Sequence, residues 1–226
     1  LLRLAEVVGQ TWVRFLYGHP ESITDGVIEA VAAHSNLCPY FDLPVQHAAS
    51  RVLKKMGRNY DKQQLLDLFQ RIRSRVPGAA IRTTLIVGFP GETDADFQEL
   101  MKFVEQVGFD HLGVFAYSDA EDLPSHWLPG HVSKKMAQFR HDTLMARQME
   151  ISASNLESMI GETLPVLIEA STEPHLYEGR TILQAPEVDG ITFVKTQPGD
   201  PAATIGEITP VTITDTLEYD LIGRAL

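Results

Sequence analysis

The segment from Ala80 to Val87 constrains the fold most, because it is a nearly continuous run of apolar and β-branched side chains. Such a run suits a parallel strand that is buried on both faces. The turn Gly88-Phe89-Pro90-Gly91-Glu92 follows it directly, and Thr93 with Asp96 predicts a capping pair for a helix through Val107. A strand, a tight turn and a helix in this order indicate a βαβ unit, and therefore a parallel sheet.

The first 130 residues repeat this alternation. Strands are predicted at residues 11–17, 40–45, 80–87 and 111–117, with helices at 25–34, 48–57, 61–75 and 93–107 between them. Four strands are too few to close an eight-stranded barrel. The sequence therefore predicts either a small open sheet or the latter part of a larger barrel.

A long helix is predicted next, from the N-cap Ser133 to about Ile160, with Gly161 ending it. Methionine and other apolar side chains recur along it, and we expect them to pack on the sheet, because methionine fills irregular cores readily. A stripe that binds a partner or cofactor is the alternative. These positions are Met136, Phe139, Leu144, Met145, Met149, Leu156 and Met159.

The remainder of the chain reads as a small all-β barrel. Five short strands are predicted at residues 163–169, 177–183, 191–196, 207–214 and 219–225, which suggests an antiparallel barrel of the OB type. We therefore expect two domains, 1–160 and 161–226. The first carries 16 basic and 19 acidic side chains (net −3), and the second carries 3 and 11 (net −8). An acidic barrel suits either docking of a basic protein or a merely soluble surface.

Charge and cysteine content exclude several classes of protein. A net charge of −11 argues against general affinity for nucleic acid, because phosphate contacts need Lys and Arg. A single cysteine excludes an intrachain disulfide framework and a cysteine-built metal site held by this chain alone, and it suits a reducing cytosol. The sequence contains no apolar run approaching the roughly 18 residues of a membrane helix. Because it does not begin with methionine, we expect it to be part of a longer protein.

Candidate binding residues lie where the predicted strands end. Gly88 and Gly91 permit close approach of a ligand to the backbone, although a purely structural turn is the usual reason for such glycines. Gln46 and His47 follow the strand 40–45 directly, so either could hydrogen-bond a ligand, but His47 taken alone is more typical of a helix-start or surface residue. Arg82 lies within a buried strand pattern, so it needs either an internal carboxylate or a carboxylate-bearing ligand. Arg14 lies within the predicted strand 11–17, so it needs such a partner for the same reason.

Several strings resemble the radical S-adenosylmethionine (SAM) methylthiotransferases. They are LPVQHAASRVLKKMGRNY, IRTTLIVGFPGETDADFQELMKFV, GVFAYS, APEVDG and EYDLIG, and the resemblance covers essentially all 226 residues. One branch of this family modifies an adenosine in transfer RNA, and the other modifies an aspartate of a small-subunit ribosomal protein. The histidine after LPVQ, the APEVDG string, the YDLIG end and the acidic barrel favour the ribosomal branch.

The resemblance implies fold, cofactors and chemistry. It implies an α/β fold, namely the latter part of a radical SAM (β/α) partial barrel followed by a TRAM barrel, which is small and OB-like. It implies SAM and two [4Fe–4S] clusters in the full-length enzymes, whose cysteines lie in a CxxxCxxC motif and in an N-terminal domain. Neither cysteine set is present here, so we expect the chain alone to be unable to cleave SAM.

Site residues and partners follow from the same resemblance. It implies cofactor-binding roles for Gln46, Arg82, Ile86, Gly88, Phe89, Pro90, Gly91 and Glu92, and it assigns neither a catalytic residue nor a metal ligand. The expected partner is a basic small-subunit ribosomal protein, bound through the acidic barrel in the cytoplasm, with no membrane involved. The alternatives are a fragment of the enzyme that modifies transfer RNA, and a non-catalytic module that docks a ribosomal protein.

Overall fold

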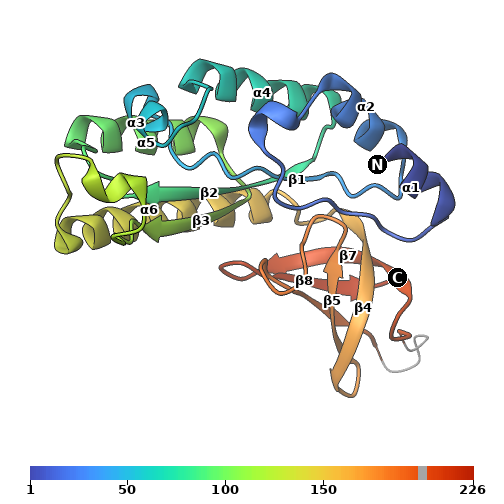
Figure 1. Ribbon diagram of the computed structural model, residues 1–226. Helices are drawn as coiled ribbons and strands as arrows, with labels where there is room; N and C mark the ends of the chain where they lie inside the picture. The colour runs from blue at the N-terminus through green and yellow to red at the C-terminus, as the bar shows by residue number, and fades with distance from the viewer. Residues whose placement is uncertain (198–202) are drawn as a thin grey trace.

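The computed structural model describes residues 1–197 and 203–226. A layer of helices covers a β-sheet, and the barrel lies below this sheet in Figure 1. A three-stranded parallel sheet with the order β1-β2-β3 forms the centre of the first part. The elements of this part are α1 (Leu2–Val7), η1 (Pro20–Ser22), α2 (Asp25–Ala33), β1 (Tyr40–Asp42), α3 (Ser50–Lys55), α4 (Lys62–Arg75), β2 (Ala80–Val87), α5 (Asp94–Val107), β3 (His111–Ala116), η2 (Pro124–Trp127) and α6 (Lys134–Glu157).

The barrel that follows is closed by five strands in the order β4-β5-β6-β8-β7. The prediction of an α/β part followed by a small all-β barrel is therefore confirmed. One detail differs, because β6 and β8 pair in parallel, so the barrel is not wholly antiparallel. Its strands are β4 (Thr163–Glu173), β5 (Leu176–Thr181), β6 (Thr192–Lys195), β7 (Ile208–Thr216) and β8 (Leu221–Ala225).

The two faces of the sheet have different surroundings. On β2, the side chains of Ile81, Thr83, Leu85 and Val87 are buried against the helices that lie above the sheet in Figure 1. The alternate side chains point to the opposite side, which we call the inner face. The register places on it Tyr40 and Asp42 of β1, Arg82, Thr84 and Ile86 of β2, and His111, Gly113 and Phe115 of β3. Strand β2 is thus fully buried on one face and only partly buried on the other.

The predicted strand at 11–17 is wrong. That segment runs beside β1 but makes only an isolated bridge, Val13 to Leu37, before Gly18 donates to the Asp42 carbonyl over 2.8 Å. Its partner β1 is only three residues long and lies between Pro39 and Pro44. Proline has no N–H for a ladder, so β1 offers too little edge for a full strand. Its β-branched and aromatic residues therefore indicated extended backbone but not pairing.

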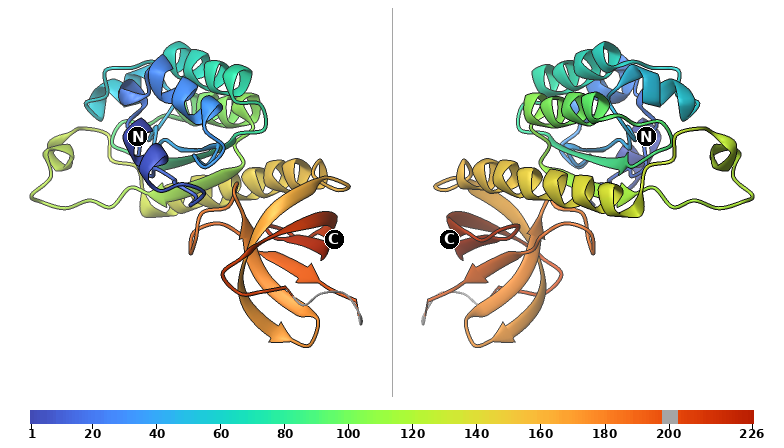
Figure 2. Two further views of the ribbon diagram at one scale, coloured as in Figure 1. Left: turned by 90° about the vertical axis from the view of Figure 1, so that its right-hand side faces the viewer. Right: turned by 90° about the vertical axis from the view of Figure 1, so that its left-hand side faces the viewer.

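Helix α6 contacts β3 and β7, and so joins the sheet to the barrel (Figure 2). Its N-cap is Ser133, as predicted, but it ends at Glu157, before Gly161. The expectation that its methionines pack on the sheet is only partly met, because Met136, Phe139 and Met149 are exposed. Small and polar residues share the inward face with Leu144 and Leu156, since Gln148 and Ser152 donate to the carbonyls of Phe109 and Asp110. The buried residues of α6 are Ala137, Arg140, Leu144, Gln148, Ser152 and Leu156.

Two hydrophobic cores stabilise these parts. The larger one fills the space between the sheet and helices α2, α4 and α5, with Phe41, Phe103 and Phe109 fully buried in it. The smaller one fills the barrel and includes Leu156 from the last turn of α6. None of the helices in the described residues has the length and apolar character required to span a membrane.

Candidate functional site

A buried carboxylate, Asp189, lies at the amino-terminal end of the inner face. It comes from the segment between β5 and β6 of the barrel, and its side chain is 1% exposed. Its Oδ2 accepts hydrogen bonds from the Tyr40 hydroxyl (2.7 Å) and the Ala185 N–H (2.8 Å), and its Oδ1 lies 3.7 Å from Arg82 Nε and 3.4 Å from His111 Nδ1. The barrel therefore inserts one negative charge into the base of the sheet.

The surroundings of Asp189 keep the Tyr40 hydroxyl protonated. Burial, followed by the Asp189 charge, raises the pKa of Tyr40, so the hydroxyl keeps its proton and donates it. Arg82 pairs with a second carboxylate, because its Nη1 lies 3.3 Å from Asp42 Oδ1. The question raised by an arginine within a strand is thus answered by internal acids, Asp42 and Asp189.

We expect Asp189→Asn to lower the free energy of unfolding by about 2 kcal/mol, the range of one charge-assisted hydrogen bond. The amide can still accept from Tyr40 and Ala185, but it loses the charge that faces Arg82. Urea unfolding at pH 7 measures the change, with the exposed Asp122→Asn as the matched control. Equal stabilities of the two variants would show that the charge contributes nothing to the packing of barrel on sheet.

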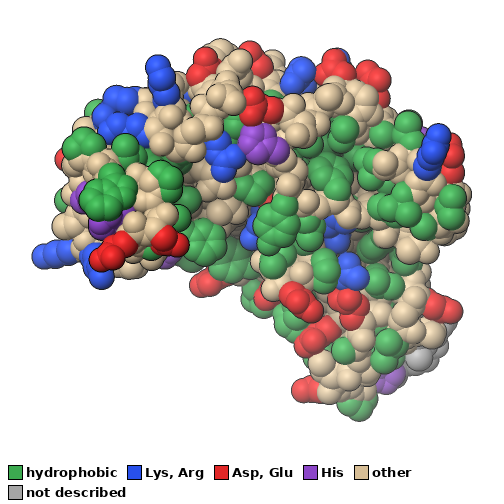
Figure 3. All heavy atoms as spheres, viewed as in Figure 1, with side chains coloured by type: hydrophobic (Ala, Val, Ile, Leu, Met, Phe, Trp, Pro, Cys, Tyr) green, Lys and Arg blue, Asp and Glu red, His purple; other side chains and the backbone are tan. Residues whose placement is uncertain are grey.

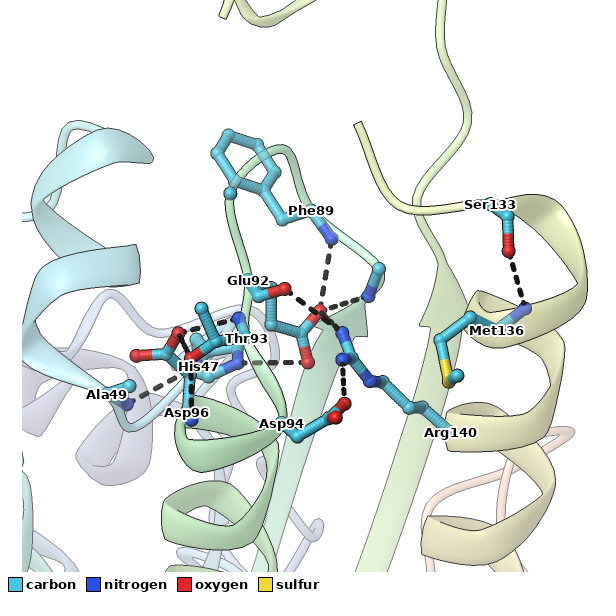
Figure 4. Close-up of polar contacts among 12 residues, drawn as sticks. His47, Ala49, Phe89, Glu92, Thr93, Asp94, Asp96, Ser133, Met136 and Arg140 are labelled. Carbon is cyan, nitrogen blue, oxygen red and sulfur yellow. Dashed lines mark hydrogen bonds and ion pairs between the residues drawn. The ribbon is translucent and has the colours of Figure 1, made fainter. Parts of the chain in front are cut away.

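The opposite, carboxyl-terminal end of the sheet carries the turn from Gly88 to Glu92. Figure 4 shows the Glu92 carboxylate between this turn and α6. Its Oε2 accepts from the N–H groups of Gly88 and Phe89, the latter over 3.2 Å, and lies 3.4 Å from Arg140 Nη1. Arg140 also binds the Asp94 carboxylate, with 2.7 Å between Nη2 and Oδ1. Glu92 is fully buried, so this carboxylate holds the turn in shape.

His47 lies on the other side of Glu92 and is also fully buried. Its Nδ1 accepts from the Ala49 N–H over 2.9 Å, which fixes the neutral tautomer with the proton on Nε2. That Nε2–H faces Glu92 Oε1 at 3.7 Å, and among the described residues neither atom has a hydrogen-bond partner. The interpretation of His47 as a surface residue is therefore wrong, and it belongs to the buried support of the turn.

Other parts of the chain fill the space next to both glycines of the turn. Gly88 has φ 77° and Gly91 has φ 80°, the left-handed region that glycine enters without strain. A Cβ on Gly88 would collide with the Cβ of Ala137 on α6, and one on Gly91 would meet the Lys55 side chain. Helix α6 thus occupies the space that the missing Cβ of Gly88 leaves.

Other predicted residues of the turn are packed inward. Phe89 is 6% exposed and meets the Tyr117 ring edge-on at 5.2 Å between centroids. Pro90 is buried next to it. The turn also begins a well-capped helix, because Thr93 and Asp96 of α5 form the reciprocal capping box that the sequence predicts. The side chains of Phe89, Pro90 and Glu92 therefore shape the turn rather than lie on its surface.

Two predicted residues remain accessible at this end of the inner face, Gln46 and Ile86. Gln46 has φ 69°, an uncommon conformation for a residue other than glycine, and it exchanges backbone hydrogen bonds with Thr84 and Ile86. Its side-chain amide has no hydrogen-bond partner within residues 1–197 and 203–226. Ile86 lies beside Phe115, which is 61% exposed. Together they offer an apolar surface with a free amide, which suits a planar ligand with polar edges.

The sequence interpretation missed the residues that organise both ends. Asp42 and Asp189 were not identified as the partners of Arg82, and Arg140 was not identified as the partner of Glu92. The cost of an unpaired buried guanidinium indicated that Arg82 needs an acid, but not which one. The sequence does carry a signal for Asp189, since this residue belongs to the APEVDG string. Arg140 carried no signal, because an arginine in a long helix is usually exposed.

The residues of this chain do not fit an iron–sulfur cluster. Such clusters are held by several cysteine thiolates, and the chain has one cysteine. Cys38 is buried, and burial raises the pKa of its thiol, which disfavours the thiolate that a metal requires. The described part of the chain contains no group of three or more His, Cys, Asp or Glu side chains placed to hold a metal ion.

Two family models match the chain. The model of the radical SAM superfamily matches residues 8–104, and that of the TRAM domain matches residues 160–226. A solved radical SAM enzyme, coproporphyrinogen III oxidase of Escherichia coli, aligns with 69% of this chain and 36% of its own, at 18% identity and a TM-score of 0.44. That likeness is too weak to support an argument of its own.

Curated relatives match over the whole chain. The protein named ribosomal protein uS12 methylthiotransferase RimO of Clostridioides difficile is 45% identical over 226 residues, which is 100% of this chain and 50% of that protein. The protein of the same name from Desulfosudis oleivorans is 48% identical with the same coverage, and that of Petrotoga mobilis is 41% identical over 222 residues. The chain thus spans about half the length of the curated relatives it matches.

Proposed function

Because the chain combines a radical SAM segment with a TRAM domain and is similar along its whole length to the RimO methylthiotransferases, we propose that it forms part of an enzyme that adds a methylthio group to ribosomal protein uS12. The observation that carries this proposal is identity of 45% and 48% over all 226 residues, including the TRAM barrel. In this proposal the acceptor is the β-carbon of an aspartate, and the protein acts in the cytoplasm.

SAM bound beside an iron–sulfur cluster supplies a radical that can take a hydrogen atom from an unreactive carbon. We assign two clusters to the complete enzyme, and their thiolate ligands to a part of it outside this sequence, because Cys38 stands alone. We also assign residues 1–160 to a partial radical SAM barrel and residues 161–226 to the TRAM barrel.

Within this chain we propose different roles for the candidate residues. Gln46 and Ile86 contact the nucleoside part of the cofactor, since their side chains are accessible on the inner face. The backbone of Gly88 and Gly91 forms the end of the same surface. Glu92, Phe89 and Pro90 are positioning residues, because their side chains are buried within the turn. Arg82 lies on the same inner face but at its opposite end, where Asp42 and Asp189 hold it, and we assign it to the part of the face next to the barrel.

The same proposal predicts that the chain alone is inactive. After incubation with iron, sulfide and a strong reductant in the absence of oxygen, it should release no deoxyadenosine from SAM, because it lacks the thiolates that hold the cluster. Liquid chromatography of the reaction mixture measures the product. Formation of deoxyadenosine in proportion to the amount of chain would contradict this assignment of the ligands.

The acidic barrel is the proposed docking surface for uS12. We expect the chain to bind purified uS12 at least tenfold more weakly at about 1 M salt than at about 0.1 M, because the screening length falls from about 10 Å to about 3 Å. Isothermal titration calorimetry measures the affinity at both salt concentrations. A transfer-RNA anticodon stem-loop serves as the competing partner.

Charge variants test whether uS12 binds to the barrel or to another part of the chain. Neutralising the exposed barrel residues Glu173, Glu207 and Glu218 together should weaken binding of uS12 about tenfold. The matched control neutralises Glu6, Glu121 and Asp122, which are exposed on the first part. Equal weakening by both triple variants would argue against docking through the barrel. Tighter binding of the stem-loop than of uS12 would favour the enzymes that modify transfer RNA.

A further inference from the structure

A groove of about 440 Å³ lies between the amino-terminal segment and the barrel, away from the turn at the carboxyl ends of the strands. Two arginines line it from opposite sides, Arg14 on the extended segment beside β1 and Arg180 on β5. Figure 3 shows Lys and Arg side chains at the junction where the barrel meets the rest of the molecule. The lining residues are Gln10, Thr11, Trp12, Arg14, Cys38, Leu167, Arg180, Gly206 and Ile208.

Arg14 is a partly buried cation without a carboxylate. Its Nη2 donates to the Ile182 carbonyl over 2.8 Å, and its guanidinium lies 4.9 Å from the centre of the Tyr40 ring. Its Nε is buried and has no hydrogen-bond partner within the described residues, none of which forms an ion pair with Arg14. Burial lowers the pKa of Arg14 and the positive charge of Arg180 acts in the same direction, while Cys38, Tyr40 and the more distant Asp189 partly oppose this shift. Its Nη1 also has no hydrogen-bond partner among the described residues but is not buried, so an anion in the groove can reach Arg14 through this atom.

Arg180 supplies a second cation at the same groove. Its Nε donates to Glu169 Oε1 over 2.8 Å, and its side chain is 20% exposed. In the part of the chain that the structure describes, its other guanidinium nitrogens have no hydrogen-bond partner. Two guanidinium groups therefore share one cavity, and no Asp or Glu is among the described residues that line it. Arg180 is one of only 3 basic side chains in a barrel that carries 11 acidic ones, and the first part of the chain places Arg14 beside it in the same groove.

We propose that this groove binds a phosphate group, held between the guanidinium groups of Arg14 and Arg180. A dianion matches two facing cations better than a single carboxylate does, and guanidinium donors fit phosphate oxygens in pairs. The groove is larger than a phosphate ion needs, and the half-buried Trp12 forms part of its wall, so a nucleotide can enter with its base against the indole. The shared chemistry is the phosphate group, whether free or carried by a nucleotide.

The thermal unfolding midpoint of the chain tests this site. Inorganic phosphate should raise the midpoint more than sodium chloride of the same ionic strength, because it binds only the folded protein. Arg180→Gln should weaken binding of phosphate at least tenfold, as expected for loss of one charge-assisted contact. Lys195→Gln is the matched control, because Lys195 is an exposed cation of the same barrel outside the groove. Arg14→Gln provides a second variant if it folds.

Each outcome decides for or against the site. A midpoint shift by phosphate that is lost in Arg180→Gln and kept in Lys195→Gln supports it. A shift no greater than that of sodium chloride, or one equally large in Arg180→Gln, overturns it. Titration with adenosine monophosphate then distinguishes a nucleotide from free phosphate as the ligand. If adenosine monophosphate half-saturates the site at a concentration at least tenfold below that of inorganic phosphate, the ligand is a nucleotide. If the two half-saturating concentrations are equal, the ligand is free phosphate. Both results retain the phosphate site, since both require the two arginines.

Discussion

Replacing Glu92 by alanine is expected to lower the free energy of unfolding by about 3–5 kcal/mol, the range for breaking a buried ion pair by removing one partner. The loss leaves Arg140 buried, with the exposed carboxylate of Asp94 as its only remaining ion-pair partner among the described residues. It also leaves the N–H groups of Gly88 and Phe89 without their acceptor. Urea unfolding followed by circular dichroism measures the change at pH 7.

Glu99→Ala is the matched control for this variant, since it removes a carboxylate from α5, the helix that begins just after Glu92. The Glu99 side chain is 39% exposed and lies 3.3 Å from Lys62 Nζ, so its removal should change stability by no more than about 1 kcal/mol. Comparable losses in the two variants would contradict the role of Glu92 as the buried support of the turn.

Gly88→Ala is the second substitution with a large expected effect, about 2–5 kcal/mol of lost stability. Part of the loss, about 1–2 kcal/mol, comes from placing a side chain at φ 77°. The rest, about 1–3 kcal/mol, comes from overpacking, because the new methyl group would collide with Ala137 and displace α6 from the turn. Urea unfolding again measures the total.

Gly57→Ala separates these two contributions. Gly57 has φ 71°, similar to that of Gly88, but an added Cβ there would meet nothing within 4 Å. Its variant should therefore show only the backbone cost of about 1–2 kcal/mol. If Gly88→Ala were no more destabilising than Gly57→Ala, close packing of α6 on the turn would not explain the glycine.

The sequence predicted the parts of this fold that local patterns determine. The strand from Ala80 to Val87, the capping box of Thr93 and Asp96, and the five strands of the barrel are all present. Pairing depends on a distant segment, and here the prediction at residues 11–17 was wrong, because β1 is too short to pair with it. The long helix likewise presents small and polar residues inward, because Gly88 and the carbonyls after α5 require them.

The candidate site was predictable in position but less so in function. Its motifs indicated correctly that the residues around Gly88 lie where strands end. They could not indicate that the Glu92 carboxylate turns inward to pair with Arg140, since that contact joins residues far apart in the sequence. Nor could they indicate that Asp189, from the barrel, supplies the acid for Arg82. Both are tertiary contacts between elements whose approach no local pattern specifies.

The central claim, that the protein takes part in methylthiolation of uS12, is tested most directly by the mass of uS12 from cells that carry or lack the gene encoding this chain. Mass spectrometry of the peptides of uS12 should find one aspartate heavier by a methylthio group in the parent cells and unmodified in the deletion strain. Reintroduction of the intact gene should restore the modification. Identical uS12 peptides in both strains, together with loss of a methylthio group from transfer RNA in the deletion strain, would contradict the claim.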